Sequence, residues 1–207
     1  MEINYFDFGL HKGDEIDMFL NAVKPLGADV CVFGFEPYPD LYDKVSLRYA
    51  GNLDIQILPY AVSDKNEIIP LYIAESNKME GNSIFSSKNN VDADNYVNVQ
   101  AVRFSDYINT IDYKDCINVI RFNIEGAEIH LFEDIISSGL NNHIDLYLGA
   151  RGGVDILKVS EISHLHSSYE NKLRENGIEV HQFCSVSQDN ISSEKICSIL
   201  QSANNEK

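Results

Sequence analysis

The sequence has no apolar run approaching the roughly 20 residues that a membrane-spanning helix needs, and its start, MEINYFDFG, lacks the basic segment of a secretory signal peptide. Basic residues are also scarce, with 16 Lys and Arg against 32 Asp and Glu and a formal net charge of −16. Such a surface repels phosphate backbones and anionic lipid headgroups. These features predict a cytoplasmic protein whose partners are neither nucleic acid nor membrane.

The four cysteines include no CxxC pair and no Cys/His cluster with the spacing of a zinc site, so we expect no metal. Cys31 and Cys184 lie in or beside apolar runs, which is typical of reduced thiols in or near a core. The sequence has no internal repeat. Its 207 residues, 44% of them hydrophobic, predict a single globular domain over 1–207.

Short apolar runs alternate with amphipathic stretches, the pattern of an α/β protein with a mainly parallel sheet. We predict strands at 3–8, 30–35, 55–62, 67–74, 96–104, 117–124, 144–149 and 178–183. Pro59 and Pro70 favour edge positions or irregular pairing for their strands. Apolar spacing predicts helices at 14–23, with Asp14 as N-cap, from about residue 40 to 50, at 129–136 and at 162–173.

Two segments depart from this alternation. Residues 75–95 are polar, rich in Asn and Ser and without period. They offer too little apolar surface to hold one conformation, so we expect a mobile loop near the mouth of a binding site. Residues 188–207 are expected to be a polar C-terminal tail with a short, frayed helix.

The strongest local signal is the turn DFGLHKG at 7–13, between the first predicted strand and helix. A parallel sheet places this turn at its carboxyl edge, where open α/β folds bind ligands. Gly9 and Gly13 allow a sharp turn and a close approach of the backbone. Their G-x-x-x-G spacing differs from the G-x-G-x-x-G of dinucleotide sites, which disfavours a nicotinamide-dependent oxidoreductase and favours a cofactor without phosphates.

Glu36 follows the second predicted strand, where a carboxylate can accept hydrogen bonds from both hydroxyls of a ribose. The alternative interpretation of these two features is a plain tight turn and a solvated acid at the end of a strand.

An ordered set of segments is more specific than either feature alone: DFGLHKG, GFEPYP at 34–39, YAVSDKNE at 60–67, RFSDYI at 103–108 and RFNIEGAEIHLFEDI at 121–135. This set resembles the FkbM family of S-adenosylmethionine-dependent methyltransferases, over about residues 3–140. The resemblance implies a Rossmann-like class I methyltransferase fold, with a mainly parallel seven-stranded sheet and helices on both faces. It also implies S-adenosylmethionine as the cofactor and methyl transfer to an oxygen of a small-molecule or glycan acceptor.

Site residues follow from the same resemblance, position by position. It implies that the methionine part of the cofactor lies against Asp7, Gly9 and Gly13, the ribose against Glu36, and the adenine near Ala61, Val62 and Asp64. From the residues themselves, Asp7 could instead cap a turn and Asp64 could form an Asx-turn.

Two departures from the family pattern concern catalysis. Asn123 and Arg121 stand where the family has Asp and Lys, and an amide cannot act as a general base. The candidate catalytic residues are therefore Asn123, Glu125 and Glu128, with His130 as a further neighbour. At the start of a predicted helix, Glu128 is expected to stay ionised with a low pKa.

Methyl transfer from a sulfonium needs little acid catalysis, because the leaving thioether is neutral and alignment supplies much of the acceleration. The sequence is thus compatible with an active methyltransferase. The alternative is a catalytically impaired FkbM-like fold that acts as a binding or interaction module.

The acceptor side carries the weakest signals. In IDLYLGARGG at 144–153 only Arg151 is charged, whereas the family has a Glu and a His near this position. The sequence begins almost on its first predicted strand, so we expect an acceptor side that is open or is built by the 75–95 loop or by a partner. An NPPY motif, which would suggest methylation of a base nitrogen, is absent.

Overall fold

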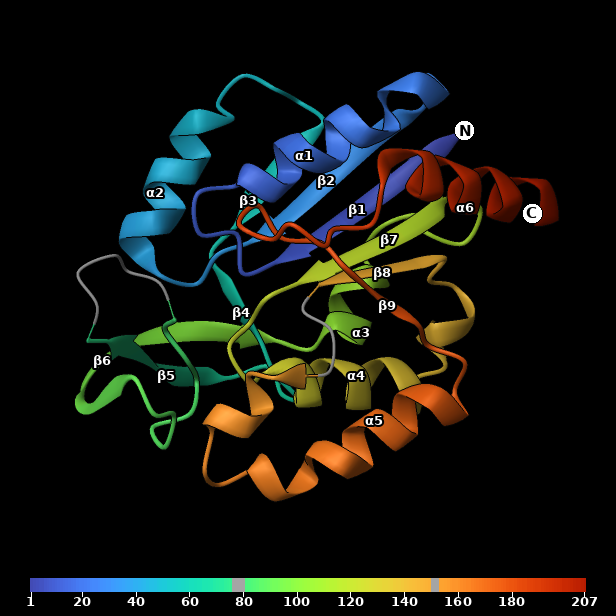
Figure 1. Ribbon diagram of the computed structural model, residues 1–207. Coiled ribbons are helices and arrows are strands. Elements are labelled where there is room, and N and C mark those ends of the chain that lie inside the picture. The colour runs from blue at the N-terminus through green and yellow to red at the C-terminus, as the bar shows by residue number, and fades with distance from the viewer. Residues whose placement is uncertain (76–80, 150–152) are drawn as a thin grey trace.

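The computed structural model describes residues 1–75, 81–149 and 153–207. The main sheet has six strands, all paired in parallel, in the order β3-β2-β1-β7-β8-β9 (Figure 1). Their bounds are Glu2–Phe8 for β1, Asp29–Phe35 for β2, Ile55–Leu58 for β3, Ile117–Phe122 for β7, Leu146–Gly149 for β8 and Val180–Gln182 for β9. The chain runs outward from β1 in one direction and from β7 in the other, so the strand order reverses between these two central strands. Open α/β sheets bind ligands beside such a reversal.

A separate sheet of three strands has the order β4-β6-β5, with β4 at Tyr60–Val62, β5 at Ile68–Ala74 and β6 at Val91–Val102. The predicted strand at 55–62 is split, because Pro59 cannot donate to a strand ladder. Its first half stays in the main sheet as β3, and its second half pairs with β6 as β4. The prediction of one seven-stranded sheet is therefore wrong for the described residues. Pro70 lies in β5, an edge strand, as predicted.

Helices cover both faces of the main sheet, as predicted (Figure 1). One face carries α1 at Asp14–Val23, α2 at Pro39–Arg48 and α6 at Ser193–Glu206, and the other carries α3 at Phe104–Ile108, α4 at Glu128–Ser137 and α5 at His166–Glu175. Short 3-10 helices lie at Lys24–Leu26, Leu140–Asn142, Ile156–Lys158 and Ser163–Leu165. Side chains alternate between the faces along a strand, so Tyr5 stacks on Phe19 of α1 while Phe6 meets Phe104 of α3.

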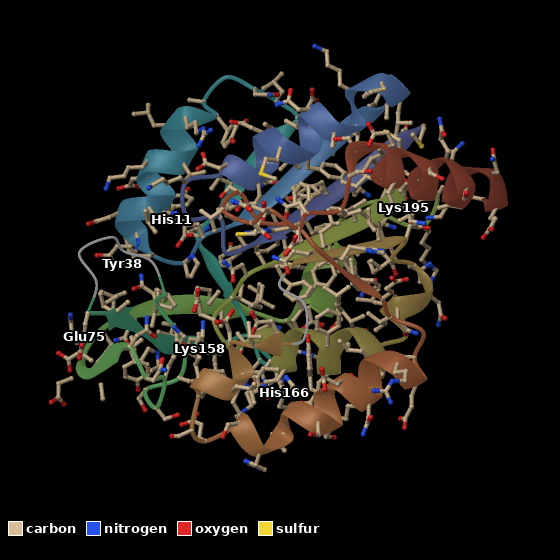
Figure 2. The ribbon with its side chains drawn as sticks, in the orientation of Figure 1. His11, Tyr38, Glu75, Lys158, His166 and Lys195 are labelled. Carbon is tan, nitrogen blue, oxygen red and sulfur yellow. The ribbon has the colours of Figure 1, made fainter. Side chains whose placement is uncertain are left out.

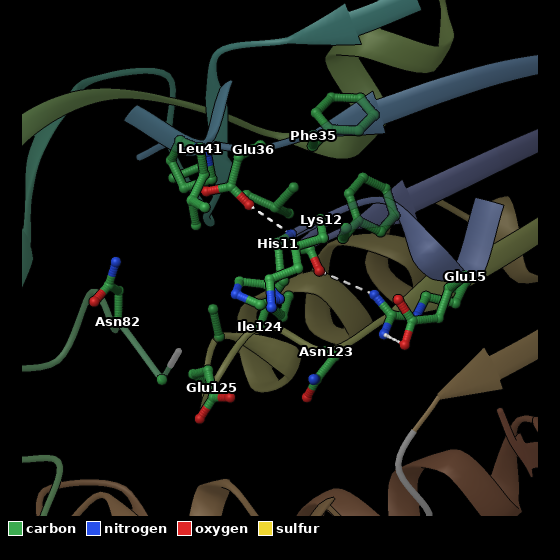
Figure 3. Close-up of a pocket in the computed structure, with 18 of the residues that line it drawn as sticks. His11, Lys12, Glu15, Phe35, Glu36, Leu41, Asn82, Asn123, Ile124 and Glu125 are labelled. Atoms are coloured by element: carbon green, nitrogen blue, oxygen red, sulfur yellow. Dashed lines mark hydrogen bonds and ion pairs between the residues drawn. The ribbon is translucent and has the colours of Figure 1, made fainter. Parts of the chain in front are cut away.

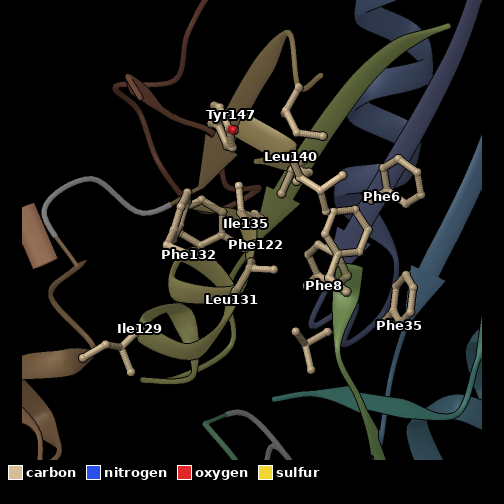
Figure 4. Close-up of a cluster of buried hydrophobic side chains, with 14 of the residues drawn as sticks. Phe6, Phe8, Phe35, Phe122, Ile129, Leu131, Phe132, Ile135, Leu140 and Tyr147 are labelled. Carbon is tan, nitrogen blue, oxygen red and sulfur yellow. The ribbon is translucent and has the colours of Figure 1, made fainter. Parts of the chain in front are cut away.

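The larger core lies under α3, α4 and α5 and is rich in aromatic rings (Figure 4). Phe8 packs on Phe35 with ring centroids 4.8 Å apart, and Phe122 meets Phe132 edge-on at 5.1 Å. Phe8, Phe35 and Phe122 each end a strand of the main sheet. This packing fixes the carboxyl ends of β1, β2 and β7 relative to one another.

Local details correct three expectations. Gly13, with φ +78°, is the N-cap of α1, while Asp14 is the first helical residue and pairs with Arg48 at 2.8 Å. Cys31 is exposed, as is Asp29 on the same face at the start of β2. The C-terminal helix α6 is a well-packed element of 14 residues, whose Ile196 and Leu200 are buried in the core that α1 also lines.

The expected loop at 75–95 has more structure than its composition indicates. β6 begins at Val91, because backbone pairing with β5 extends a strand whose side chains at 92–95 are exposed. Ser83 and Lys88 are buried. Residues 76–80 of this segment, and Arg151, lie outside the described residues.

Candidate functional site

A pocket of about 250 Å³ opens at the carboxyl edge of the main sheet, next to the reversal between β1 and β7 (Figure 3). One wall is apolar, formed by Phe35, Leu41, Tyr60, Ala61, Val62 and Leu71. Polar side chains surround the rest, including His11, Glu36, Asn82, Asn123 and Glu125. Both sheets contribute, because Tyr60, Ala61 and Val62 belong to β4 of the small sheet.

Gly9 brings the turn after β1 against the turn after β7. Its φ is +82°, and a Cβ built on it would lie 2.2 Å from the carbonyl oxygen of Asn123. No other residue type fits this position without moving the backbone. Gly13 lies outside the pocket lining, where it packs against the ring of Tyr49.

A buried ion network supports the floor of the pocket. Arg121 lines the floor and donates from Nη1 to Asp7 Oδ1 at 2.9 Å and to the carbonyl oxygen of Gly9 at 2.9 Å. Its Nη2 lies 3.3 Å from Glu15 Oε1. Burial raises the pKa of Asp7 to about 6, although Arg121 acts to lower it. Asp7 is fully buried behind the floor, so it acts on the pocket through Arg121 and the Gly9 turn.

The chain returns to this site after β9. Cys184, Ser185 and Val186 line the pocket, and the backbone N–H of Ser185 donates to Glu15 Oε1 at 2.9 Å. Burial acts to raise the pKa of Glu15, but Arg121 and Ser185 outweigh it and hold that pKa below its usual value.

Glu36, which the sequence analysis predicts as a ribose ligand, lines the pocket. Its Oε2 accepts from the backbone N–H of His11 at 2.9 Å, and its Oε1 accepts from that of Tyr38 at 3.0 Å. Both donors lie at the carboxyl edge of the sheet (Figure 2). Burial raises the pKa of Glu36 to about 7. Each carboxylate oxygen has two lone pairs, so both retain capacity to accept a ligand hydroxyl.

Two of the three residues predicted near the adenine line the pocket. Ala61 and Val62 form part of the apolar wall. Asp64 does not reach it and lies at a separate shallow depression beside Arg103 and Asp134.

The turn after β7 presents two of the three predicted catalytic residues. Asn123 and Glu125 line the pocket, with Ile124 between them. Glu125 has φ +58° and His11 has φ +51°, a left-handed conformation that no other non-glycine residue adopts among those that the structure describes. Both lie on the pocket, and backbone strain of this kind concentrates at functional sites.

Glu128 has a structural position. It is buried, its Oε1 accepts from the N–H of Ile124 at 3.0 Å and its Oε2 accepts from that of Gly126 at 2.7 Å. Burial raises its pKa to about 7, so the expected low pKa is wrong. Complete removal from water outweighs the helix dipole here. His130 also lies off the pocket lining, with its ring stacked on Phe85.

The sequence interpretation missed several residues at this site. Asn82, Ile84 and Ser185 line the pocket, and Lys88 pairs with Glu125. The available signal was the apolar pair Ile84-Phe85 inside the polar 75–95 segment, which marks a point where that segment packs onto the fold.

Two other features are absent from the part of the chain that the structure describes. No group of three or more His, Cys, Asp or Glu side chains is arranged to hold a metal ion there. None of the helices over these residues has the length and apolar character that a bilayer crossing requires.

The chain matches the model of the methyltransferase FkbM domain over residues 7–183. A similar solved structure is the methyltransferase FkbM from Methylobacillus flagellatus KT, with 15% identity and a TM-score of 0.45, in a match that covers 76% of this chain and 36% of that one. The chain thus spans about a third of that protein's length. No curated protein matches it. Because the family model covers most of the sequence, the chain belongs to the FkbM methyltransferase family.

Proposed function

We propose that this protein is an S-adenosylmethionine-dependent methyltransferase that acts on an oxygen of a small-molecule or carbohydrate-like acceptor in the cytoplasm. The observation that carries the proposal is the joint position of Glu36 and the Gly9 turn on one pocket with an apolar wall. Membership of the FkbM family supports the same assignment.

The residues present fit this donor. Glu36 can accept from the ribose hydroxyls, and Ala61 and Val62 offer an apolar wall to the adenine. Beside the Gly9 turn, the two carboxyl groups of Asp7, behind the floor, and Glu15, in the pocket lining, share one guanidinium, that of Arg121. This excess of carboxyl groups at the Gly9 turn favours the ammonium of the methionine part and repels a pyrophosphate, which also argues against a nicotinamide cofactor.

When bound, S-adenosylmethionine would supply a methyl group carried on a sulfonium. The electron pair of the broken C–S bond would stay with sulfur, and the acceptor oxygen would form the new bond to the methyl carbon. The chain's task is to align the acceptor hydroxyl and to receive its proton. Asn123 can hydrogen-bond the hydroxyl but cannot take the proton. Glu125 lines the pocket with a side chain 21% exposed, whereas both oxygens of Glu128 are engaged by backbone N–H groups. We therefore assign alignment to Asn123 and proton acceptance to Glu125.

Calorimetry with S-adenosylhomocysteine, S-adenosylmethionine and NAD tests the donor. Glu36→Ala should weaken binding of S-adenosylhomocysteine by about 1.5–3 kcal/mol, through loss of charge-assisted hydrogen bonds. Asp64→Ala is the matched control, because Asp64 lies off the pocket, and it should bind like the parent. A folded Glu36→Ala variant with parental affinity would show that Glu36 does not hold the ribose, and binding of NAD alone would reject the proposal.

A second candidate, a catalytically impaired binding module, is favoured by Asn123 in place of the family's Asp. Asn123→Asp separates the two in an assay of S-adenosylhomocysteine release with a panel of hydroxylated acceptors. If the protein is a working enzyme, Asn123→Asp should leave turnover unchanged or reduce it. If it is a degraded enzyme, the same change should raise turnover. Donor binding without turnover of any acceptor, with or without the Asp, would favour the module.

A further inference from the structure

Three residues of the segment 81–90 contact the turn that carries Glu125. The hydroxyl of Ser83 donates to the carbonyl oxygen of Glu125 at 2.8 Å, and Lys88 Nζ lies 2.8 Å from Glu125 Oε2. The ring of Phe85 packs close to Gly126, where an added Cβ would lie 3.3 Å from it. Asn82 of the same segment also lines the pocket, and its amide oxygen accepts from the backbone N–H of Ala74 at 2.9 Å. Both the backbone and the carboxylate of Glu125 are thus held from outside their own turn.

Lys88 is an unusual partner for a residue on an open pocket, because its side chain is only 1% exposed. Its ammonium also donates to the carbonyl oxygen of Gly81 at 2.9 Å and to Asn90 Oδ1. Its backbone is fixed by a bridge to Val159. A buried ammonium is costly unless it is paired and hydrogen-bonded, and here all three of its donors are used. The positive charge of Lys88 is therefore held in place beside the carboxylate of Glu125.

Glu125 lines the pocket, and the ammonium of Lys88 balances the negative charge of its carboxylate. Lys88 holds Oε2, while Oε1 accepts no hydrogen bond from the described residues. The nearby Lys158 does not add a free charge, because it pairs with Asp155 at 2.6 Å. A hydroxyl group in the pocket can donate to Oε1, whereas a cation there gains little from a carboxylate whose charge is already balanced.

We infer that Lys88 is a specificity-determining residue: by balancing Glu125 it makes the pocket select neutral, hydroxyl-bearing acceptors over cationic amines. The inference rests on the proposed methyltransferase function. Lys88 lies in the segment predicted as a loop. It would influence the choice of acceptor through Glu125 and without touching the acceptor itself.

Two analogues of the methyl donor test how the pocket responds to a charge at the position of methyl transfer. Neither measurement needs a known acceptor. Sinefungin carries a cationic amine on the carbon that replaces the sulfonium, and S-adenosylhomocysteine is neutral there. Calorimetry gives the ratio of their dissociation constants. Lys88→Met leaves Glu125 unbalanced, so sinefungin should tighten about three- to tenfold relative to S-adenosylhomocysteine. A purely structural role of Lys88 would change both affinities together and leave the ratio unchanged.

Lys88→Arg should retain the parental ratio. Lys172→Met, which removes a charge of the same sign from an exposed pair with Glu133, should also retain it. Glu125→Gln leaves the ammonium unbalanced instead, so sinefungin should weaken about three- to tenfold, and this variant serves if Lys88→Met does not fold. If the parent binds S-adenosylhomocysteine but neither Lys88→Met nor Glu125→Gln changes the ratio of dissociation constants, the inference alone is overturned. Absence of that binding in the parent would overturn the proposed function and the inference with it.

Discussion

Arg121 and Asp7 are direct neighbours across the two central strands, β7 and β1, although 114 residues separate them in the sequence. Their ion pair of 2.9 Å is buried on both sides, and Glu15 adds a second carboxylate to the same guanidinium. One cation thus holds two acidic groups and the carbonyl oxygen of Gly9 together beneath the pocket.

Removal of this cation should cost more than removal of either acid. Arg121→Met leaves two buried carboxylates without a cationic partner and should lower the free energy of unfolding by about 3–5 kcal/mol. Asp7→Asn leaves Arg121 paired with Glu15, so we expect a loss of about 1–3 kcal/mol. Urea unfolding at pH 7 measures both. Arg48→Met, at an exposed pair, should cost less than about 1 kcal/mol, and an equal loss in all three variants would contradict a buried network.

Gly9 and Gly27 offer a matched test of the turn after β1. Both have positive φ, but a Cβ on Gly27 meets nothing within 4 Å, whereas one on Gly9 meets the backbone of Asn123. Gly27→Ala should cost about 1 kcal/mol, the penalty of a left-handed L-residue. Gly9→Ala should cost more than about 3 kcal/mol and abolish binding of S-adenosylhomocysteine, because the two turns must separate. Similar losses from the two changes would mean that the turns are not in contact.

Donor binding should depend on pH through Glu36. Its pKa is raised to about 7 by burial, and ribose hydroxyls donate to the ionised form. Below its pKa each pH unit lowers the ionised fraction about tenfold, so affinity for S-adenosylhomocysteine should be roughly tenfold weaker at pH 6 than at pH 8. Glu36→Gln should bind more weakly with a flat profile in the same titration. A parent profile that is flat over this range would argue against an ionised Glu36 in the complex.

Glu128 should give the stability of the fold a pH dependence. Because its folded-state pKa is raised from 4.5 to about 7, its contribution is complete below pH 4.5 and is lost as the pH rises through 7. Glu128→Gln replaces one of the two side-chain oxygens that accept from backbone N–H groups and should cost about 1–3 kcal/mol at pH 5. The gap to the parent should narrow by pH 8, since only the parent must ionise a buried acid. Thermal unfolding at the two pH values measures the gap, and the exposed Glu133→Gln should show no such change. A gap that widens with pH would contradict a raised pKa.

The main sheet could be predicted from the sequence because its central strands, β1 and β7, are covered on both faces and therefore read as continuous apolar runs. The small sheet could not be predicted as a separate unit. The first half of β6 exposes its side chains, and its pairing with β5 is a property of the backbone that hydrophobic periodicity does not report.

The lining of the candidate site could be predicted where a turn after a strand itself carries the residue. Gly9, Glu36, Asn123 and Glu125 lie on the pocket because each follows a strand at the carboxyl edge. Asp7 precedes that edge, within β1, and its side chain lies behind the floor. Lys88 was missed because a lysine among Asn and Ser reads as solvated, and only the fold shows the carboxylate that it meets.

The wall that joins Glu15 to Ser185 has a consequence for biosynthesis. These residues are 170 positions apart, so the pocket cannot close until residue 185 has left the ribosome and the segment after β9 has docked. Contacts of such long sequence separation form late and slowly in folding. Under the proposed function, the methyl donor should therefore bind only after this contact has formed. By mass action, a donor that binds in this way would stabilise only the completed fold, so the increase in stability that it produces would measure the fraction of protein in which Ser185 has docked against Glu15.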